Sequence, residues 1–269
     1  MPSDAATREP PRAGAPRDLA HRRAAGLALL GLLALAAPAR ATAPAFNAAA
    51  LDTVLARHLR DGQVDYGALA RDRAALDRFL ASTERARPDD WPRAEQIAFW
   101  VNAYNARVLE GVIDHPGIGS VLEVGRIAGV PTLAFFRSKR LTAGRRLSLN
   151  DIEHGILRAR FADPHLHFVL NCASASCPVL PARALTGAAL ENELEDATRR
   201  FLSDSTRNRI DPARQLELSM IFKWYGEDFQ KSVGSVQAFI ERNWPGHERF
   251  APDLPTRYLP YDWTLNGRW

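Results

Sequence analysis

Apolar residues recur at three- and four-residue intervals through most of the chain, the spacing that places them on one face of an α-helix. The segments with this pattern, which we predict to be helices, are 51–60, 66–82, 93–113, 149–160, 186–202 and those beginning at Ser219 and Ser235. Short apolar runs typical of a strand and a hairpin occur at 165–171 and 208–218. The pattern predicts a helix-rich α+β single domain, with a small sheet that carries the His167–Cys177 stretch.

The segment 93–113 is the most apolar of the predicted helices and has only a narrow polar strip, which indicates a buried helix. Asn102 and Asn105 lie about one turn apart inside its apolar arc. Buried amide groups need hydrogen-bond partners. We expect these two side chains either to tie neighbouring loops to the helix or to bind substrate, and the sequence leaves both alternatives open.

The predicted helix 149–160 follows a capping-box pattern that begins at Ser148, and it carries a glutamate on its apolar face. Glu153 falls within the arc of leucine and isoleucine residues, where an unpaired carboxylate is costly. It is expected either to form a structural ion pair with Arg160 or to belong to a functional site. His154 points roughly the other way, so helix geometry alone favours a solvated or capping role.

The stretch 163–178 holds both cysteines of the protein and two of its seven histidines. Its first half is the predicted strand 165–171, in which His165 and His167 share one face. His165 is expected at the surface near the start of this strand. The loop that follows contains small and hydroxyl-bearing residues, and it ends at Pro178, a residue that favours the first position of a helix or turn.

One role for this loop is nucleophilic catalysis, because Cys177 can fold back beside the strand. A helical turn opened by the following proline would then lower the pKa of the Cys177 thiol. In this arrangement His167 is the base and Glu153 orients its imidazole. The backbone N–H groups of 175–177 would form an oxyanion hole.

Two other roles for the cysteines compete with this one. In an oxidising compartment Cys172 and Cys177 can form a local disulfide, or both can be small buried residues without a chemical role. If the loop lines a site, Cys172 and Ser176 are expected to contact the substrate. No metal or other cofactor is predicted, because a structural zinc site uses four nitrogen or sulfur ligands at closer spacings.

Residues 1–41 have the three parts of a secretory signal peptide. A basic region with Arg22 and Arg23 precedes an apolar run of 14 residues, and Ala39-Arg40-Ala41 supplies small residues for cleavage. A spanning helix needs about 20 apolar residues, so we expect cleavage and no stable membrane span afterwards. The protein is then periplasmic or secreted, with a linker over 42–50 and one domain over 51–269.

Cleavage would also change the charge of the chain. The full sequence has 35 basic and 31 acidic residues, and residues 1–41 hold six arginines and three acidic residues. The remaining chain therefore has 29 basic and 28 acidic residues, a net charge of +1 with histidine neutral. No basic tract indicates nucleic-acid binding, and the expected partner is a small molecule or an envelope component.

Several long motifs resemble the domain-of-unknown-function 547 (DUF547) family. They are QIAFWVNAYNA at 96–106, LSLNDIEHGILR at 147–158, HFVLNCASASCP at 167–178, LSMIFKWYGEDF at 218–229 and YDWTLN at 261–266. The resemblance places Glu153, His154, His167 and Cys177 at recurring family positions and implies a polar site that contains cysteine and histidine. His165 departs from the family, which usually has arginine there, so any role of that arginine is in doubt.

The resemblance brings no settled activity, and the sequence leaves open whether the protein is an enzyme. The first hypothesis is an exported cysteine-dependent hydrolase or transferase that acts on amide or thioester bonds, with Cys177, His167, Glu153 and His154 as catalytic residues. The alternative is a non-catalytic binding or scaffold protein of the cell envelope, in which Cys172 is paired with Cys177.

Overall fold

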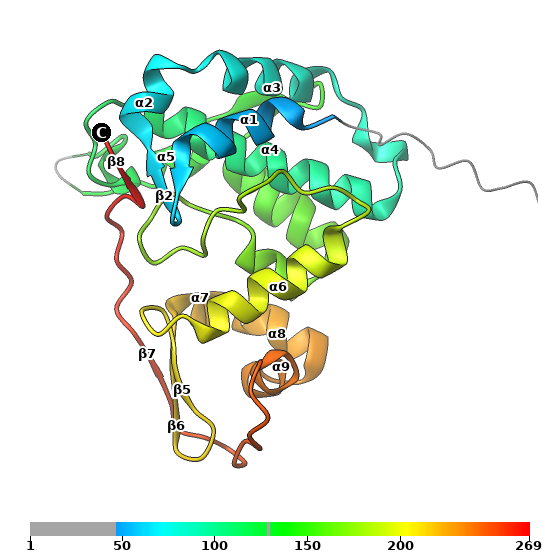
Figure 1. The fold of residues 1–269 in the computed structure, drawn as a ribbon, viewed down its shortest axis with the longest axis vertical. Coiled ribbons are helices and arrows are strands. Elements are labelled where there is room, and N and C mark those ends of the chain that lie inside the picture. Colours follow the sequence, from blue (N-terminus) through cyan, green and yellow to red (C-terminus); the bar gives the residue numbers. More distant parts are fainter. Residues whose placement is uncertain (1–46, 128–129) are drawn as a thin grey trace, which may run out of the picture. The chain divides into compact units, whose positions relative to one another are not determined.

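A computed structural model describes residues 47–127 and 130–269, which form one helix-rich α+β domain (Figure 1). The predicted signal peptide, residues 1–41, lies outside the described residues, and of the predicted linker 42–50 only 47–50 are described. Helix α1 already begins at Ala49, two residues before the predicted start. No helix in the described part of the chain has the length and apolar character needed to cross a bilayer.

The described N-terminal part is mainly helical. Its elements are α1 (Ala49–His58), α2 (Tyr66–Arg71), α3 (Ala74–Arg85), η1 (Pro88–Asp90), α4 (Arg93–Ile113), η2 (Val121–Glu123) and α5 (Ala134–Arg137). The predicted bounds of the helix 93–113 are confirmed by α4. The predicted helix 66–82 is instead two helices, because the backbone leaves the helical region at Asp72, whose carboxylate binds Arg57 of α1.

The second half adds further short helices around the site. They are the π-helix η3 (Asp151–Phe161), the 3-10 helix η4 (Pro164–Phe168), α6 (Leu190–Ser203), α7 (Met220–Trp224), α8 (Gly226–Val233) and α9 (Val236–Asn243). The predicted starts at Ser219 and Ser235 are confirmed, because Ser219 accepts a hydrogen bond from the N–H of Ile221 and Ser235 accepts one from Ala238. The helix predicted over 186–202 begins only at Leu190, and its N-cap residue, Ala189, has no side-chain cap. Ser148 and Asp151 form a reciprocal capping pair before η3.

The predicted strand 165–171 is wrong. Asp163 accepts a hydrogen bond from the N–H of His165, and Pro164 occupies the first helical position, so the segment starts the 3-10 helix η4. The apolar run that follows is buried, which a short helical turn achieves as well as a strand does. The His167–Cys177 stretch is therefore not carried by a sheet, and its one recorded pairing is an isolated bridge between Ser174 and Leu265.

The sheets of the described residues are small. Their strands are β1 (Leu59–Arg60), β2 (Gln63–Asp65), β3 (Arg140–Thr142), β4 (Arg145–Leu147), β5 (Arg209–Asp211), β6 (Gln215–Leu218), β7 (Thr256–Tyr258) and β8 (Gly267–Arg268). The hairpin β5–β6 confirms the one predicted over 208–218. The C-terminal segment adds β7 parallel to β6 and then β8 parallel to β2, and Figure 1 shows it running between these two sheets.

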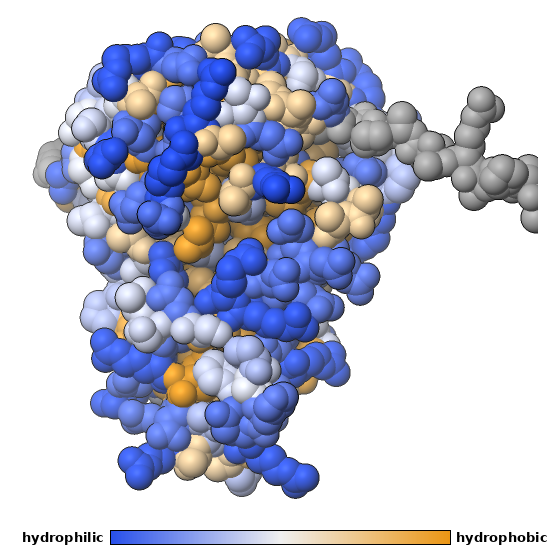
Figure 2. All heavy atoms as spheres, viewed as in Figure 1, coloured by the Kyte–Doolittle hydropathy of each residue, from blue (hydrophilic) through white to orange (hydrophobic). Residues whose placement is uncertain are grey.

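The core is built around α4, which is buried along most of its length. Trp100, Tyr104 and Val112 are each at most 2% exposed. Asn102 and Asn105 each clamp a passing loop onto α4, Asn102 through the backbone N–H and C=O of Leu185, and Asn105 through Val169 and Asn171. Figure 2 shows mostly hydrophilic residues on the viewed face, with hydrophobic residues gathered between α1 and α6.

Candidate functional site

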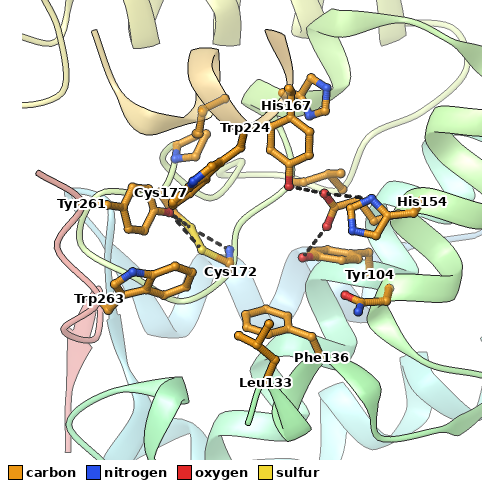
Figure 3. A pocket seen from close by; sticks show the side chains of 16 residues that line it. Tyr104, Leu133, Phe136, His154, His167, Cys172, Cys177, Trp224, Tyr261 and Trp263 are labelled. Carbon is orange, nitrogen blue, oxygen red and sulfur yellow. Dashed lines mark hydrogen bonds and ion pairs between the residues drawn. A yellow bond between two sulfur atoms is a disulfide. The ribbon is translucent and has the colours of Figure 1, made fainter. Parts of the chain in front are cut away.

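A cavity of about 230 Å³ lies where α4, η3, η4, α7, the 172–178 loop and the C-terminal segment meet. Figure 3 shows two groups of side chains that face one another across it. The carboxylate wall consists of Tyr104, Glu153, His154 and Tyr225, and the sulfur wall consists of Cys172, Cys177, Trp224, Tyr261 and Trp263. The structure thus brings the predicted Glu153, His154, His167, Cys172 and Cys177 to one cavity.

Glu153 is the centre of the carboxylate wall and is 7% exposed. The Tyr225 hydroxyl donates to Oε1 at 2.5 Å, and the Tyr104 hydroxyl donates to Oε2 at 3.2 Å. Two hydroxyl donors offset the cost of burying a carboxylate. Burial and the nearby Glu153 charge raise the pKa of both phenols, so both hydroxyls remain protonated donors at neutral pH. The predicted ion pair with Arg160 is wrong, because that guanidinium binds Asp89 and Gln96.

His154 is the more exposed member of this wall, with a side chain 44% accessible to solvent. Its Nδ1 lies 3.0 Å from Arg158 Nη1 and 3.9 Å from Glu153 Oε1. Because a guanidinium can only donate, the neutral imidazole carries its proton on Nε2. His154 is therefore a site residue as well as a partly solvated one.

An ion-pair network supports the wall from behind. Arg158 donates to both oxygens of Asp228, with Nε–Oδ2 and Nη2–Oδ1 distances of 2.7 Å and 2.9 Å. His167 Nε2 binds the same Asp228 Oδ2 at 2.8 Å, and its ring stacks on Tyr225 with centroids 4.0 Å apart. The His167 hydrogen bond and the Arg158 guanidinium hold the pKa of Asp228 well below its ordinary range, although burial acts in the opposite direction. This network fixes the ring of Tyr225 and so the phenol that binds Glu153.

The helix that carries Glu153, His154 and Arg158 has π-helical geometry. Such geometry is rare and is frequently found at functional sites. It widens each turn relative to an α-helix, so neighbouring positions are turned by less than the usual 100°. Glu153 and His154 both line the cavity, although an α-helical projection includes Glu153 in the apolar arc and leaves His154 outside it.

The sulfur wall contains a disulfide between Cys172 and Cys177, with an S–S distance of 2.07 Å. The sequence left three roles open for the cysteines: nucleophile, local disulfide or inert burial. In the structure they form the local disulfide. The nucleophile arrangement is not formed, because His167 Nε2 is bonded to Asp228 and no helix in the described chain begins at Pro178. The Tyr261 hydroxyl lies 3.2 Å from both sulfur atoms, and the N–H of Cys172 donates to Cys177 Sγ at 2.9 Å.

The expected oxyanion hole is also absent from the described loop. The N–H groups of Ala175 and Ser176 donate to the carbonyls of Thr264 and Asp262, and that of Cys177 donates to Ser174. These bonds attach the loop to the C-terminal segment, which positions Tyr261 and Trp263 in the sulfur wall. The backbone N–H groups of this loop therefore hold it against the C-terminal segment and do not face an anion site.

The remaining predicted residues lie away from the cavity. Asn102 and Asn105 use their amides as loop clamps on α4, which is the structural one of their two expected roles. Ser176 accepts a hydrogen bond from the N–H of Asp262 and helps to hold the loop. His165 is half-buried and binds Asp163 and Asn243, so it is not the free surface residue that was expected.

Sequence reasoning missed several residues that build the cavity. Tyr104 lies within the apolar predicted helix 93–113, and nothing in the sequence distinguishes its hydroxyl as a site group. Tyr225, Asp228 and Tyr261 lie within motifs that resemble the family, so those motifs were the available signal. Their roles could not be assigned because the segments lie 50 to 100 residues from the central stretch and meet it only in the fold.

Within 47–127 and 130–269, no three histidine, cysteine, aspartate or glutamate side chains are grouped as metal ligands. Comparison with known proteins gives one family. Residues 88–202 match the family model described as "Protein of unknown function, DUF547". No curated protein and no solved structure matches the chain. The matched residues include Tyr104, Glu153, His167 and the disulfide, so this part of the chain, residues 88–202, belongs to the DUF547 family.

Proposed function

We propose that the protein is an exported binding protein that takes a small organic cation into the cavity between the carboxylate wall and the sulfur wall. One observation carries this proposal. Among the described residues that line the cavity, Glu153 is the only carboxylate, and none is lysine or arginine. A cation would therefore meet one buried negative charge and no competing positive side chain, apart from any charge on the histidines.

The aromatic residues support the same ligand class. Trp224, Tyr261 and Trp263 form a cluster in the sulfur wall, with ring centroids 4.7 Å apart for Trp224–Tyr261 and for Tyr261–Trp263. Tyr104 and Tyr225 contribute rings from the opposite wall. Faces of tryptophan and tyrosine attract ammonium groups, with about 0.5–2 kcal/mol for each well-placed ring.

The nearest guanidinium does not cancel this preference. Arg158 forms a bidentate pair with Asp228, so the two charges compensate each other behind the carboxylate wall. The hydrogen-bond donors to Glu153 are the hydroxyl groups of Tyr104 and Tyr225, and the Nδ1 atom of His154 lies 3.9 Å from its Oε1. Glu153 therefore remains the one carboxylate among the described residues that line the cavity.

Export is supported by the signal-peptide pattern in residues 1–41 and by the disulfide, because disulfides persist mainly in oxidising compartments. A periplasmic or extracellular location would also give the binding protein access to solutes from outside the cell. The binding role corresponds to the non-catalytic alternative drawn from the sequence.

Ligand binding is tested with choline and with its uncharged isostere, in which carbon replaces the ammonium nitrogen. Binding is followed by the fluorescence of the tryptophans in the sulfur wall and by calorimetry. We expect choline to bind at least about tenfold more tightly than the isostere, since about 1.4 kcal/mol corresponds to a factor of ten. Glu153→Gln should remove this difference while keeping the shape of the side chain. Its carbonyl oxygen can still accept from one tyrosine hydroxyl, and its amide nitrogen can donate to the oxygen of the other.

The matched control is Glu227→Gln, which removes a carboxylate that is 80% exposed on α8 and paired with Lys231. This variant should bind choline like the unmodified protein. Equal affinity for choline and its isostere in the unmodified protein, or no binding of either, would contradict the proposal.

The cysteine-dependent hydrolase or transferase is a second candidate, and it concerns the reduced protein. It is favoured by the position of Cys177 Sγ, which lines the cavity and accepts the N–H of Cys172. A hydrogen-bond donor at sulfur lowers the pKa of a thiol and raises its reactivity near neutral pH. Iodoacetamide labelling of the reduced protein across the pH range tests this candidate, and a Cys177 that stays unreactive up to about pH 9, above the ordinary thiol pKa, would exclude it.

A further inference from the structure

We propose that the Cys172–Cys177 disulfide is a site of thiol–disulfide exchange, in which the thiolate of a small aminothiol attacks Cys172 and Cys177 leaves. This inference deepens the proposed function and rests on it for the choice of an aminothiol, because the ammonium group would be drawn to Glu153. The thiolate would then meet the opposite wall of the cavity, where Figure 3 shows the disulfide.

The two sulfur atoms differ in their accessibility. Cys177 is 2% exposed, whereas Cys172 is only half-buried, and both line the cavity. Exchange begins with attack on one particular sulfur, and access helps to decide which one reacts. The accessible Cys172 is therefore the expected point of attack, and Cys177 is the expected leaving group.

The surroundings of Cys177 suit a leaving thiolate. Its Sγ already receives the N–H of Cys172 at 2.9 Å and lies 3.2 Å from the Tyr261 hydroxyl. Burial raises the pKa of Tyr261, so this hydroxyl remains a donor over the range in which thiols titrate. The Tyr261 hydroxyl is equally far from Cys172 Sγ, so the N–H of Cys172 is the donor that distinguishes Cys177 from its partner. Hydrogen-bond donors favour the thiolate, and a leaving group of lower pKa departs faster.

The backbone around the leaving sulfur is held by a partly buried cation. Arg207 donates from Nε to the carbonyl of Cys177 at 2.7 Å and from Nη2 to the carbonyl of Ala175 at 2.9 Å. Its side chain is 16% exposed, so these bonds are largely shielded from water. When the disulfide opens, this attachment keeps the Cys177 sulfur near its donors instead of releasing the loop.

The exchange is balanced without an additional oxidant. The aminothiol loses its proton to water, its sulfur bonds to Cys172 Sγ, and the electron pair of the Cys172–Cys177 bond moves to Cys177 Sγ. The products are a mixed disulfide on Cys172 and a thiolate on Cys177. A second aminothiol thiolate can then attack the aminothiol sulfur of the mixed disulfide. Cys172 leaves as a thiolate, two aminothiols become one disulfide, and the protein disulfide is reduced.

The first experiment needs no variant. The oxidised protein is mixed with cysteamine, quenched with iodoacetamide and fragmented in a mass spectrometer. The expected product carries cysteamine on Cys172 and the alkyl group on Cys177. The opposite arrangement, or the absence of a mixed disulfide, would overturn the proposal.

The second experiment compares cysteamine, mercaptoethanol and mercaptopropionate at equal thiolate concentration. We expect rates in the order cationic, neutral, anionic, with the differences removed in Glu153→Gln. Equal rates in the unmodified protein would refute the aminothiol preference. Choline binding separates the two proposals. If choline binds but cysteamine does not exchange, only the exchange proposal fails. If choline does not bind and the three thiols react at equal rates, the cation proposal itself fails.

The leaving-group argument is tested with Tyr261→Phe, which removes one donor to Cys177. In the reduced variant the pH profile of Cys177 alkylation should move to higher pH, and exchange with cysteamine should slow several-fold. Tyr258→Phe is the matched control, because Tyr258 lies on β7 of the same segment and does not line the cavity. An unchanged alkylation profile in Tyr261→Phe would contradict the assigned role of this hydroxyl.

Discussion

Replacing Asp228 with asparagine tests whether the network behind the carboxylate wall stabilises the fold. Asp228 accepts three hydrogen bonds from Arg158 and His167, each between 2.7 and 2.9 Å. Asparagine has nearly the same shape, but its amide nitrogen cannot accept, so one of these donors loses its partner. Removing one member of a buried ion pair costs about 3–5 kcal/mol. Because the Asp228 side chain is 20% exposed and His167 can change tautomer, we expect a loss of about 2–3 kcal/mol.

The same variant has a pH signature. The pKa of Asp228 is lowered in the folded state, so its contribution is fully present above the unfolded pKa of about 3.9 and is lost as the pH falls through the folded value. The difference in unfolding free energy between the unmodified protein and Asp228→Asn should therefore be constant above about pH 5. It should shrink below about pH 4, where only the unmodified protein still gains a proton at this position on unfolding.

Urea denaturation followed by tryptophan fluorescence measures both effects, with the midpoint and slope compared at each pH. Glu227→Gln serves as the control on the same helix, since its exposed carboxylate should change stability by less than about 0.5 kcal/mol. A loss below about 1 kcal/mol in Asp228→Asn at neutral pH would refute the reasoning. A difference that stays constant down to about pH 2 would refute the assigned pKa direction.

Three further predictions concern other parts of the chain. Asn102→Ala leaves the buried N–H and C=O of Leu185 without partners and should cost about 2–4 kcal/mol in urea denaturation, whereas a cost near zero would mean that the clamp is dispensable. Reducing the disulfide should lower the free energy of unfolding by about 2 kcal/mol, the loop-entropy value for so short a loop, and thermal denaturation with and without a phosphine reductant measures it. If residues 1–41 are a cleaved signal peptide, N-terminal sequencing of protein recovered from the periplasm should begin at Thr42, and an intact Met1 there would contradict cleavage.

The longest helix could be predicted from sequence with its bounds, whereas the predicted helix 66–82 is divided in the structure. The apolar pattern of 93–113 reproduces α4 because a buried helix of this length leaves a clear 3.6-residue period. The burial of Glu153 was also predictable, since it depends on the same period. The prediction of a strand at 165–171 was wrong because a short apolar run fits a strand and a helical turn equally well. The hydrogen bond from the N–H of His165 to Asp163 favours the helical turn.

The chemistry of the site was less predictable than its location. The resemblance to the family placed Glu153, His154, His167 and Cys177 together, and they do share one cavity. Their pairings depend on Tyr225 between α7 and α8, on Asp228 of α8 and on Tyr261 of the C-terminal segment. No local pattern links residues so far apart, and the choice of Asp228 rather than Cys177 as the partner of His167 is set by packing.

The pairing of the C-terminal segment with the cysteine loop has a consequence for the order in which this protein is made. Translation produces Tyr104, Glu153 and the cysteines long before Tyr261 and Trp263, so a nascent chain holds an unfinished cavity whose sulfur wall lacks its tyrosine and one of its two tryptophans. The loop N–H groups that later bind Thr264 and Asp262 are then unpaired. A cysteine pair that meets an oxidase at this stage would react before its hydroxyl donor arrives.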